Sequence, residues 1–186
     1  MNTLLKPKKS DFVRVKISAK FMRLKFVDCN ASYIVHNCKG SCCQKGDGTT
    51  MIAIAKQEVK RIRELGGIVH KGILKGSPCM FKNPHGLCTI HKTGQPLGCG
   101  ISPFALNKNN TLIIRHRYLT MKCHKEGTIP AYKVFRRSLD IIFGEQSASY
   151  ICRLLDDNRG DFRTKMKKDI YKIMKDNEST RRKAKI

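Results

Sequence analysis

Eight of the nine cysteines in this 186-residue chain are placed where they could bind metal. They form an early group, a middle group and one later residue. In chain order they are Cys29, Cys38, Cys42, Cys43, Cys79, Cys88, Cys99 and Cys123. A thiolate is a soft, strongly electron-donating ligand, and groups of thiolates suit zinc or the iron of iron–sulfur clusters. The residues therefore predict a metal-binding protein whose cofactor is Zn²⁺ or an iron–sulfur cluster.

The spacing of these cysteines leaves the number of centres open. Cys38 and Cys42 are four residues apart, so a single turn can bring both to one ion. Neighbouring side chains diverge in an extended segment, so Cys42 and Cys43 must either share a turn or serve two adjacent centres. The middle group is spaced by nine and eleven residues, so its members can meet only if the Pro/Gly-rich loops between them fold back. Eight thiolates satisfy two four-thiolate sites, or one cluster and one zinc.

Other cysteine and histidine side chains have simpler interpretations. Cys152 lies on the apolar side of a predicted helix and is expected to be a small buried hydrophobic residue. His91 and His124 closely follow ligand cysteines, and we expect them to hydrogen-bond to thiolates, although either could replace one. His36 and His85 are expected at the surface. The chain contains no glycine-rich phosphate loop, nucleophile elbow or His-Glu-x-x-His motif.

The charge of the chain is strongly positive. There are 38 Lys and Arg residues against 14 Asp and Glu, which gives a formal net charge of +24. Such a charge repels itself unless a polyanion or counterions screen it, and nucleic acid is the commonest polyanion. The alternative is an ordinary solvated surface that is rich in lysine. The composition therefore favours, without requiring, a nucleic-acid or other polyanion partner.

The expected cellular compartment follows from the lack of long apolar segments in the sequence. No stretch approaches the roughly 20 apolar residues of a membrane span, and the first residues have no apolar run typical of a secretory signal. We therefore expect a cytoplasmic protein with reduced thiols, in which clustered cysteines indicate metal. A disulfide framework in an exported protein is the alternative.

Hydrophobic periodicity predicts the elements that position the cysteines. Alternation predicts strands at 12–17 and 22–26, and an asparagine-rich turn predicts a hairpin over 104–118. Residues 37–50 are expected to form a metal-holding loop. The predicted helices cover 54–65, 134–143, about 148–155 and 161–177, the last of them capped by Asp161.

Together these elements predict an α+β fold. Small antiparallel strands and a helix would surround metal-stapled loops, with C-terminal helices packed beside them. We expect a cysteine-cluster domain at 1–128, a helical segment at 129–177 and a basic tail at 178–186.

The order of the cysteines and their neighbours resembles the YkgJ-type cysteine-cluster family of zinc- or iron-chelating domains. The resemblance covers roughly residues 26–125 and rests on Phe26-Val-Asp-Cys29, Cys38-Lys-Gly-Ser-Cys42-Cys43, Cys79, Cys88-Thr-Ile-His91, Pro96-Leu-Gly-Cys99 and Ser102-Pro103. It implies the early and middle cysteines as ligands, with Cys123 as a further candidate. The chain departs from the family at two positions where an arginine is usual. Gln95 precedes Pro96, and Gly100 follows Cys99.

Three functions are compatible with these features. The first is a cysteine-cluster metal-binding protein whose iron–sulfur cluster or zinc serves redox, sensing or modification chemistry. The second is a structural-zinc module whose basic surface binds nucleic acid. The third is a metal-cluster-dependent modification enzyme, which the resemblance suggests because flagellin lysine methylases carry a similar cluster. A charge of +24 would repel a basic substrate of such an enzyme.

Overall fold

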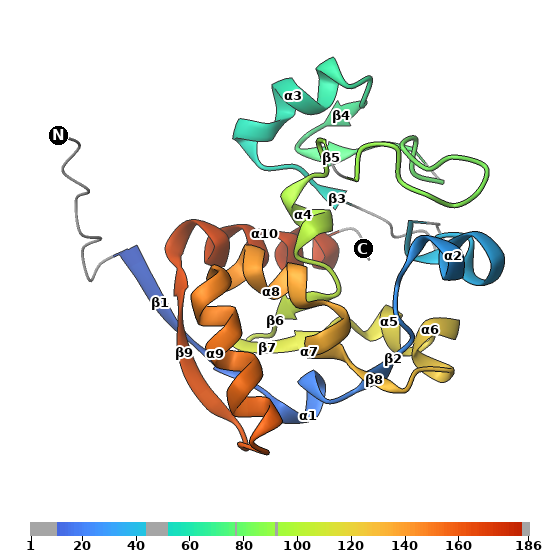
Figure 1. The fold of residues 1–186 in the computed structure, drawn as a ribbon. Helices are drawn as coiled ribbons and strands as arrows, with labels where there is room; N and C mark the ends of the chain where they lie inside the picture. Colours follow the sequence, from blue (N-terminus) through green and yellow to red (C-terminus); the bar gives the residue numbers. More distant parts are fainter. Residues whose placement is uncertain (1–10, 44–51, 77, 92, 184–186) are drawn as a thin grey trace, which may run out of the picture.

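The computed structural model describes residues 11–43, 52–76, 78–91 and 93–183 (Figure 1). It has the predicted α+β class, with helices gathered toward the C-terminus. The largest sheet has four strands in the order β6-β7-β1-β9. Their bounds are β1 Phe12–Ile17, β6 Phe104–Leu106, β7 Thr111–Ile114 and β9 Phe162–Lys167. Because β1 runs parallel to β7 and antiparallel to β9, this sheet is mixed rather than wholly antiparallel.

Two sequence predictions in this sheet are confirmed. β1 alternates as expected, with Val15 and Ile17 buried. β6 and β7 form the predicted hairpin, in which the side chain of Asn107 accepts the backbone N–H groups of Asn109 in the turn and of Thr111 at the start of β7. The second hairpin strand is shorter than predicted. It ends at Ile114, and the chain turns into the short helix α5, His116–Leu119.

The strand predicted at 22–26 is largely wrong. Helix α1, Ala19–Met22, occupies its start, and only β2, Lys25–Phe26, is extended. β2 pairs with β8, Ile129–Pro130. The helix forms there because the carboxylate of Asp161 accepts the N–H of Ala19 at 2.9 Å. This partner is 142 residues away in sequence and therefore invisible to local periodicity.

The helix predicted at 161–177 is also wrong in its first half. Residues 162–167 form β9, which pairs with all six residues of β1, and α10 runs from Lys168 to Lys183. Phe162 and Met166 are four apart, a spacing that fits both one face of a helix and one face of a strand. Pairing with β1 decides between them. The predicted basic tail is helical as far as Lys183, and residues 184–186 lie outside the described residues.

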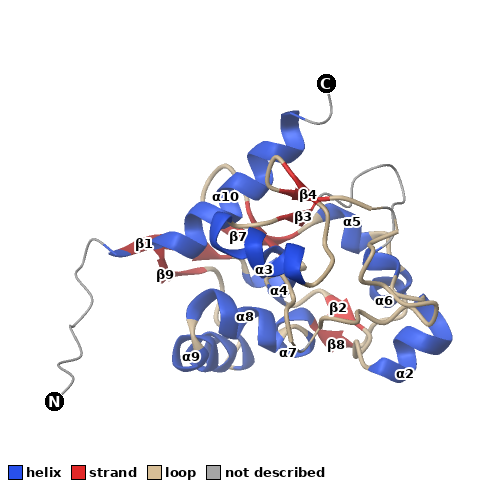
Figure 2. Cartoon of the chain, turned by 90° about the horizontal axis from the view of Figure 1, so that it is seen from above, coloured by secondary structure: helices blue, strands red, loops and turns tan. Residues whose placement is uncertain are grey.

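The last three helices before β9 are α7 Ala131–Val134, α8 Arg136–Phe143 and α9 Glu145–Asp156. They include the two that the sequence predicts, α8 and α9, and an additional short one, α7. Gly144, at φ 79°, separates the last two. In Figure 2 these helices lie together on one side of the strands of the large sheet. Their apolar faces and those of the strands form the main core, which includes Ile17, Phe26, Phe104, Leu112, Leu139, Ile142 and Ile151.

A second, smaller unit spans residues 52–91 and lies at the top of Figure 1. Its helix is shorter than the predicted 54–65 and consists of η4 Lys56–Glu58 and α3 Val59–Glu64. Three two-residue strands pair in the order β3-β5-β4, with bounds Ile52–Ala53, Ile73–Leu74 and Val69–His70. Its buried residues form the small core: Ile54, Ile62, Val69, Leu74, Phe81 and Ile90.

Short elements at the junction of the two cores carry most of the cysteines. They are α2 Ala31–Tyr33, the π-helical turn η2 Ile34–Cys38, the 3₁₀ turn η3 Ser41–Cys43, α4 Leu97–Gly100 and α6 Lys122–Lys125. Part of the loop predicted at 37–50 is thus helical, and its residues 44–50 lie outside the described part of the chain.

Two further predictions concern the whole chain. None of the helices in the described residues combines the length and hydrophobicity that crossing a membrane requires. The domain division expected near residue 129 stays a prediction. The pairing of β9 with β1 means that the C-terminal segment contributes a strand to the sheet in which β1 lies.

Candidate metal centre

The first thiol group comprises Cys29, Cys38, Cys42 and Cys123. Cys29 follows β2, Cys38 ends η2 and Cys123 lies on α6, so three separate segments converge. The N–H of Val27 donates to the carbonyl of Cys123 at 2.8 Å, which fixes α6 against the chain leading to Cys29. Although residue Cys29 is exposed as a whole, desolvation of its thiol and then the charges of Cys42, Cys38 and Cys123 raise its pKa to about 12. Burial raises the pKa values of Cys79, Cys88 and Cys99, and the charge of Cys42 also raises them, so Cys42 lies within electrostatic reach of these thiols as well as of its own group.

The second thiol group comprises Cys43, Cys79, Cys88 and Cys99. Cys79 donates its N–H to the carbonyl of Cys43 at 3.2 Å, and a β-bridge between Lys82 and Cys88 folds the intervening loop back. Cys99 lies on α4. Burial raises the pKa of Cys99 to about 12, with smaller contributions from Cys79 and Cys88. The loop between Cys79 and Cys88 thus folds back, as a meeting of these thiols requires.

Cys42 and Cys43 join the two groups. They lie on the turn η3, and their sulfur atoms are 3.9 Å apart. The hydrogen bond between them is the main cause that lowers the pKa of Cys42 to about 7, and it raises the pKa of Cys43. Cys42 packs against the main core, whereas Cys79 and Cys88 pack against the small core. The adjacent pair therefore lies where the two units meet.

Two glycines allow the loops of the two groups to touch. Gly40 (φ 61°) and Gly86 (φ 88°) both have left-handed backbones, a conformation that favours glycine. A Cβ atom on Gly40 would lie 2.2 Å from the carbonyl oxygen of Gly86, and one on Gly86 would lie 2.4 Å from the carbonyl carbon of Lys39. A side chain at either position would separate the early cysteine loop from the middle one.

The thiols are gathered but not closed around a common point. Among the described residues, no set of three or more His, Cys, Asp or Glu side chains has the arrangement of a formed metal site. All nine cysteines are free thiols. The donor chemistry of each group fits a four-thiolate site. The geometry described would have to tighten before four sulfur atoms could reach one ion at about 2.3 Å.

Two arginines near the thiols were missed by the sequence analysis. The positive charge of Arg117 favours the thiolate of Cys42, and that of Arg115 favours the thiolate of Cys99. Arg115 is buried and donates to the hydroxyl of Ser102 at 3.0 Å. The guanidinium of Arg117 lies 4.9 Å from the ring centroid of Tyr118. Both lie in the sequence Arg-His-Arg directly after β7. Nothing in the residues beside them along the chain indicates that they lie near thiols.

The remaining predictions can be placed as well. Cys152 on α9 packs against the main core, as predicted, although it is half-buried rather than buried. The Nδ1 atom of His124 lies 2.7 Å from the carbonyl oxygen of Lys25, so this nitrogen binds backbone rather than a thiol. His91 and Arg137 lie together, with 3.3 Å between the imidazole Nδ1 and a guanidinium nitrogen. The hydrogen bonds to thiolates that the sequence predicts for His91 and His124 stay predictions. His36 and His85 are exposed, as predicted.

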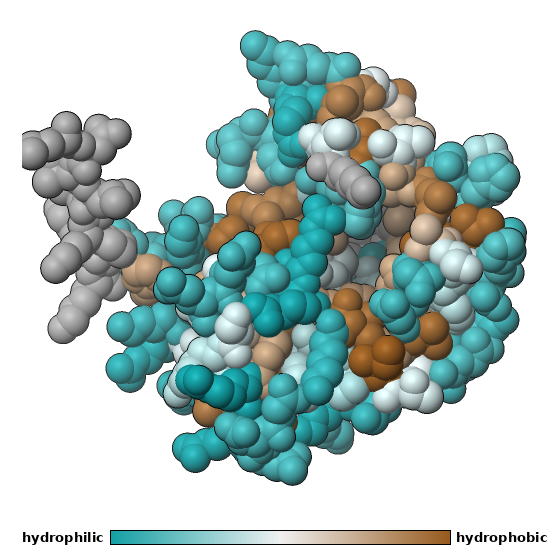
Figure 3. Space-filling view, viewed as in Figure 1, coloured by the Kyte–Doolittle hydropathy of each residue, from teal (hydrophilic) through white to brown (hydrophobic). Residues whose placement is uncertain are grey.

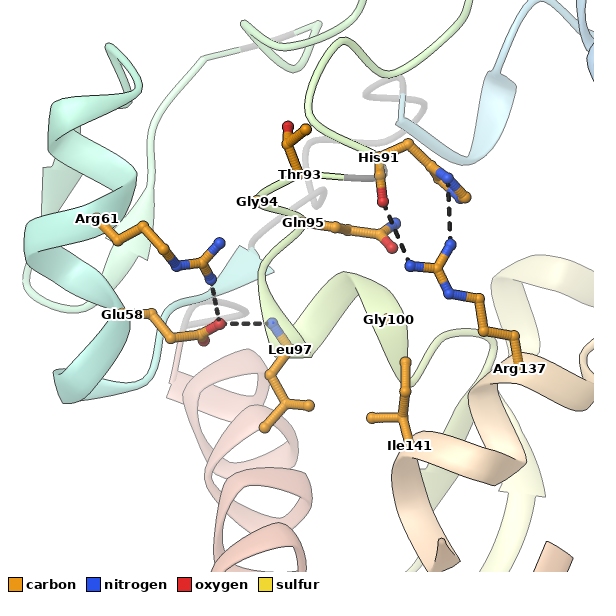
Figure 4. A pocket seen from close by; sticks show the side chains of 10 residues that line it. All are labelled: Glu58, Arg61, His91, Thr93, Gly94, Gln95, Leu97, Gly100, Arg137 and Ile141. Atoms are coloured by element: carbon orange, nitrogen blue, oxygen red, sulfur yellow. Dashed lines mark hydrogen bonds and ion pairs between the residues drawn. The ribbon is translucent and has the colours of Figure 1, made fainter. Parts of the chain in front are cut away.

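A cavity of about 270 Å³ lies beside the loop that leads to Cys99. Figure 4 shows Arg61 and Arg137 on opposite sides of it. The carboxylate of Glu58 accepts the N–H of Leu97 at 2.9 Å and pairs with Arg61 at 3.0 Å. These contacts attach α4, and therefore Cys99, to the small unit.

Comparison with known proteins identifies no relative. No family model matches the chain, and neither a curated protein nor a solved structure is significantly similar to it. The resemblance to the YkgJ-type family therefore stays a prediction that rests on the residues quoted above.

Proposed function

We propose that this protein binds metal through eight thiolates in two neighbouring sites. Cys29, Cys38, Cys42 and Cys123 would hold one, and Cys43, Cys79, Cys88 and Cys99 the other. The bound group would be Zn²⁺ or an iron–sulfur cluster, both of which take four thiolate ligands. The observation that carries the proposal is the junction at Cys42 and Cys43, where two sets of thiols from distant segments meet.

The surroundings of the thiols support this proposal. Four thiolates around a divalent ion carry a net negative charge, and Arg115 and Arg117 would offset it. Within the described residues, the Nε of Arg117 is a buried donor without a hydrogen-bond acceptor. Buried donors are rarely left unpaired, and a metal-bound sulfur is a suitable acceptor for one.

The small core gives an independent reason to expect a metal. It consists of six buried residues and three two-residue strands, which is little apolar burial for the loops it must order. Binding of a structural metal contributes directly to folding free energy. Closure of the thiols on two ions would hold this unit to the large sheet through the adjacent cysteines.

The test is metal analysis of protein purified without oxygen. We expect about two zinc ions per chain, or iron with sulfide and brown colour. Cys42→Ser and Cys43→Ser should each lower the metal content, and each should leave the other site partly filled. Protein that contains neither zinc nor iron above trace amounts would refute the proposal.

Cys152→Ser is the matched control. Cys152 lies outside both thiol groups, with its sulfur 3.9 Å from the carbonyl oxygen of Tyr132. The variant should retain the full metal content. If it loses as much metal as Cys42→Ser, the loss reflects general unfolding, and the ligand assignment fails.

A second candidate function is contact with nucleic acid in the cytoplasm. The observation that favours it is the charge of +24, which an acidic partner would neutralise. Reduced cysteines are typical of cytosolic proteins and suit both functions. An affinity for nucleic acid that stays constant as salt rises would contradict this candidate, because phosphate contacts release counterions.

A further inference from the structure

The pairing of β1 with β9 places like charges opposite each other. Arg14 lies across from Lys165, and Lys16 across from Arg163. All four side chains are exposed, as is Lys167 at the end of the same row. We call these five residues the cationic face. Figure 3 shows the side of the molecule on which α8 and α9 lie in front of this sheet, and the surface at its left is largely hydrophilic there too.

This arrangement costs stability. Like charges directly opposite one another destabilise an antiparallel pair, whereas opposite charges stabilise it. Neither strand contains an acidic residue. Asp161, just before β9, pairs with Lys16 at 2.8 Å, but it belongs to neither strand. A sheet that needed only solubility would gain from alternating signs, so the uniform sign calls for another explanation.

Protection of a sheet edge accounts for only part of it. Lysines on an edge strand prevent pairing with other chains, which would explain the charges of β9. β1 pairs with β9 along its whole length but with β7 only at Lys16 and Ile17. Edge protection therefore extends to Arg14, which lies beyond the pairing with β7, and does not explain Lys16.

We propose that the cationic face binds the phosphate backbone of double-stranded nucleic acid. Alternate residues on a strand are about 6.6 Å apart, so Arg163, Lys165 and Lys167 span roughly 13 Å. That length covers about four phosphates of one strand at a rise of about 3.4 Å. Phe12 is the only aromatic residue of the two strands on this face, and the chain has no tryptophan. Single-strand binding commonly relies on aromatic stacking, so the face suits a duplex and reads no bases.

This inference rests on the nucleic-acid contact proposed above, and the experiment separates the two. Binding of a 20-base-pair duplex, as DNA and as RNA, is measured at salt concentrations from about 50 to 200 mM. The double variant Arg14→Gln/Lys165→Gln should reduce the slope of log affinity against log salt by about 1.8 for DNA, or about 0.9 for each lost contact. Comparing the two duplexes shows which nucleic acid binds better.

The matched control is Lys56→Gln/Lys60→Gln, which removes the same charge from exposed residues of the small unit. It should leave the slope unchanged. Equal reductions in the two double variants would refute the cationic face while leaving nucleic-acid contact in place. A wild-type protein that binds neither duplex would refute the cationic face, and one that also fails to bind a single strand would refute nucleic-acid contact.

A single charge reversal distinguishes binding from a structural role. Lys165→Glu converts the pair with Arg14 into an attractive one, so the melting temperature should rise by roughly 1–3 °C. Duplex affinity should fall at the same time. A more stable variant with unchanged duplex affinity would overturn the proposal.

Discussion

The main core and the small core are ordered in different ways. The main core lies between a four-stranded sheet and helices of up to sixteen residues, and its central side chains are fully buried. The small core has strands of two residues and six buried side chains, and loops carry two of its cysteines. Apolar burial explains the first region. The second has little apolar burial, and the proposed binding of metal by its thiols would add cross-links.

The largest expected difference between the two regions follows metal removal. Chelation without oxygen should raise the hydrogen-exchange rates of amides in residues 52–76 and 78–91 by about 100-fold or more, which corresponds to ~2.8 kcal/mol of local stability. Amides of β1, β7 and β9 should change little, because the main core holds them. Equal changes in both regions, measured by mass spectrometry, would show that the small core does not depend on metal separately.

The converse change truncates a buried side chain in the main core. Leu139 on α8 is fully buried, and Leu139→Ala should lower the free energy of unfolding by about 2–5 kcal/mol. Metal content should stay at the wild-type value, because no thiol ligand is removed. Urea denaturation and elemental analysis of the same sample measure both quantities. Loss of metal in this variant would mean that the two regions are one cooperative structure.

A smaller effect is expected where the two regions touch. Gly40→Ala forces a left-handed backbone on alanine, which costs about 1–2 kcal/mol, and pushes its Cβ against the carbonyl oxygen of Gly86. Metal affinity should fall because the early and middle loops separate. Gly66→Ala is the control, since Gly66 also has a positive φ but no atom within 4 Å of the added Cβ. Equal metal affinities in the two variants would count against contact between the loops.

Local patterns predicted the elements whose apolar residues fit only one periodicity, that of a strand or that of a helix. Strand β1, the β6–β7 hairpin and helices α8 and α9 follow from alternation, an asparagine turn and a glycine stop. The errors occur where two periods fit the same residues. Phe162 and Met166 satisfy a helix or a strand, and only the partner strand selects one. The start of α1 likewise depends on a hydrogen bond from Ala19 to distant Asp161.

The candidate ligands can be proposed from the sequence alone, whereas their grouping cannot. Cysteine type and number indicate thiolate chemistry whatever the fold. Which four thiols lie near one another depends on hydrogen bonds such as that from Cys79 to Cys43, and on the approach of Gly40 to Gly86. Arg117 could not be assigned, because nothing in its neighbours along the chain marks it.

The sequence by itself determined the soft donor set, the positive charge and the apolar periods of the main core, because these depend on residue type and local spacing. Only the tertiary structure decided that Cys42 and Cys43 stand between two thiol groups, and that Arg14 faces Lys165. Both facts join segments far apart in the chain. Such contacts form when the whole fold buries its apolar surface, so no local pattern encodes them.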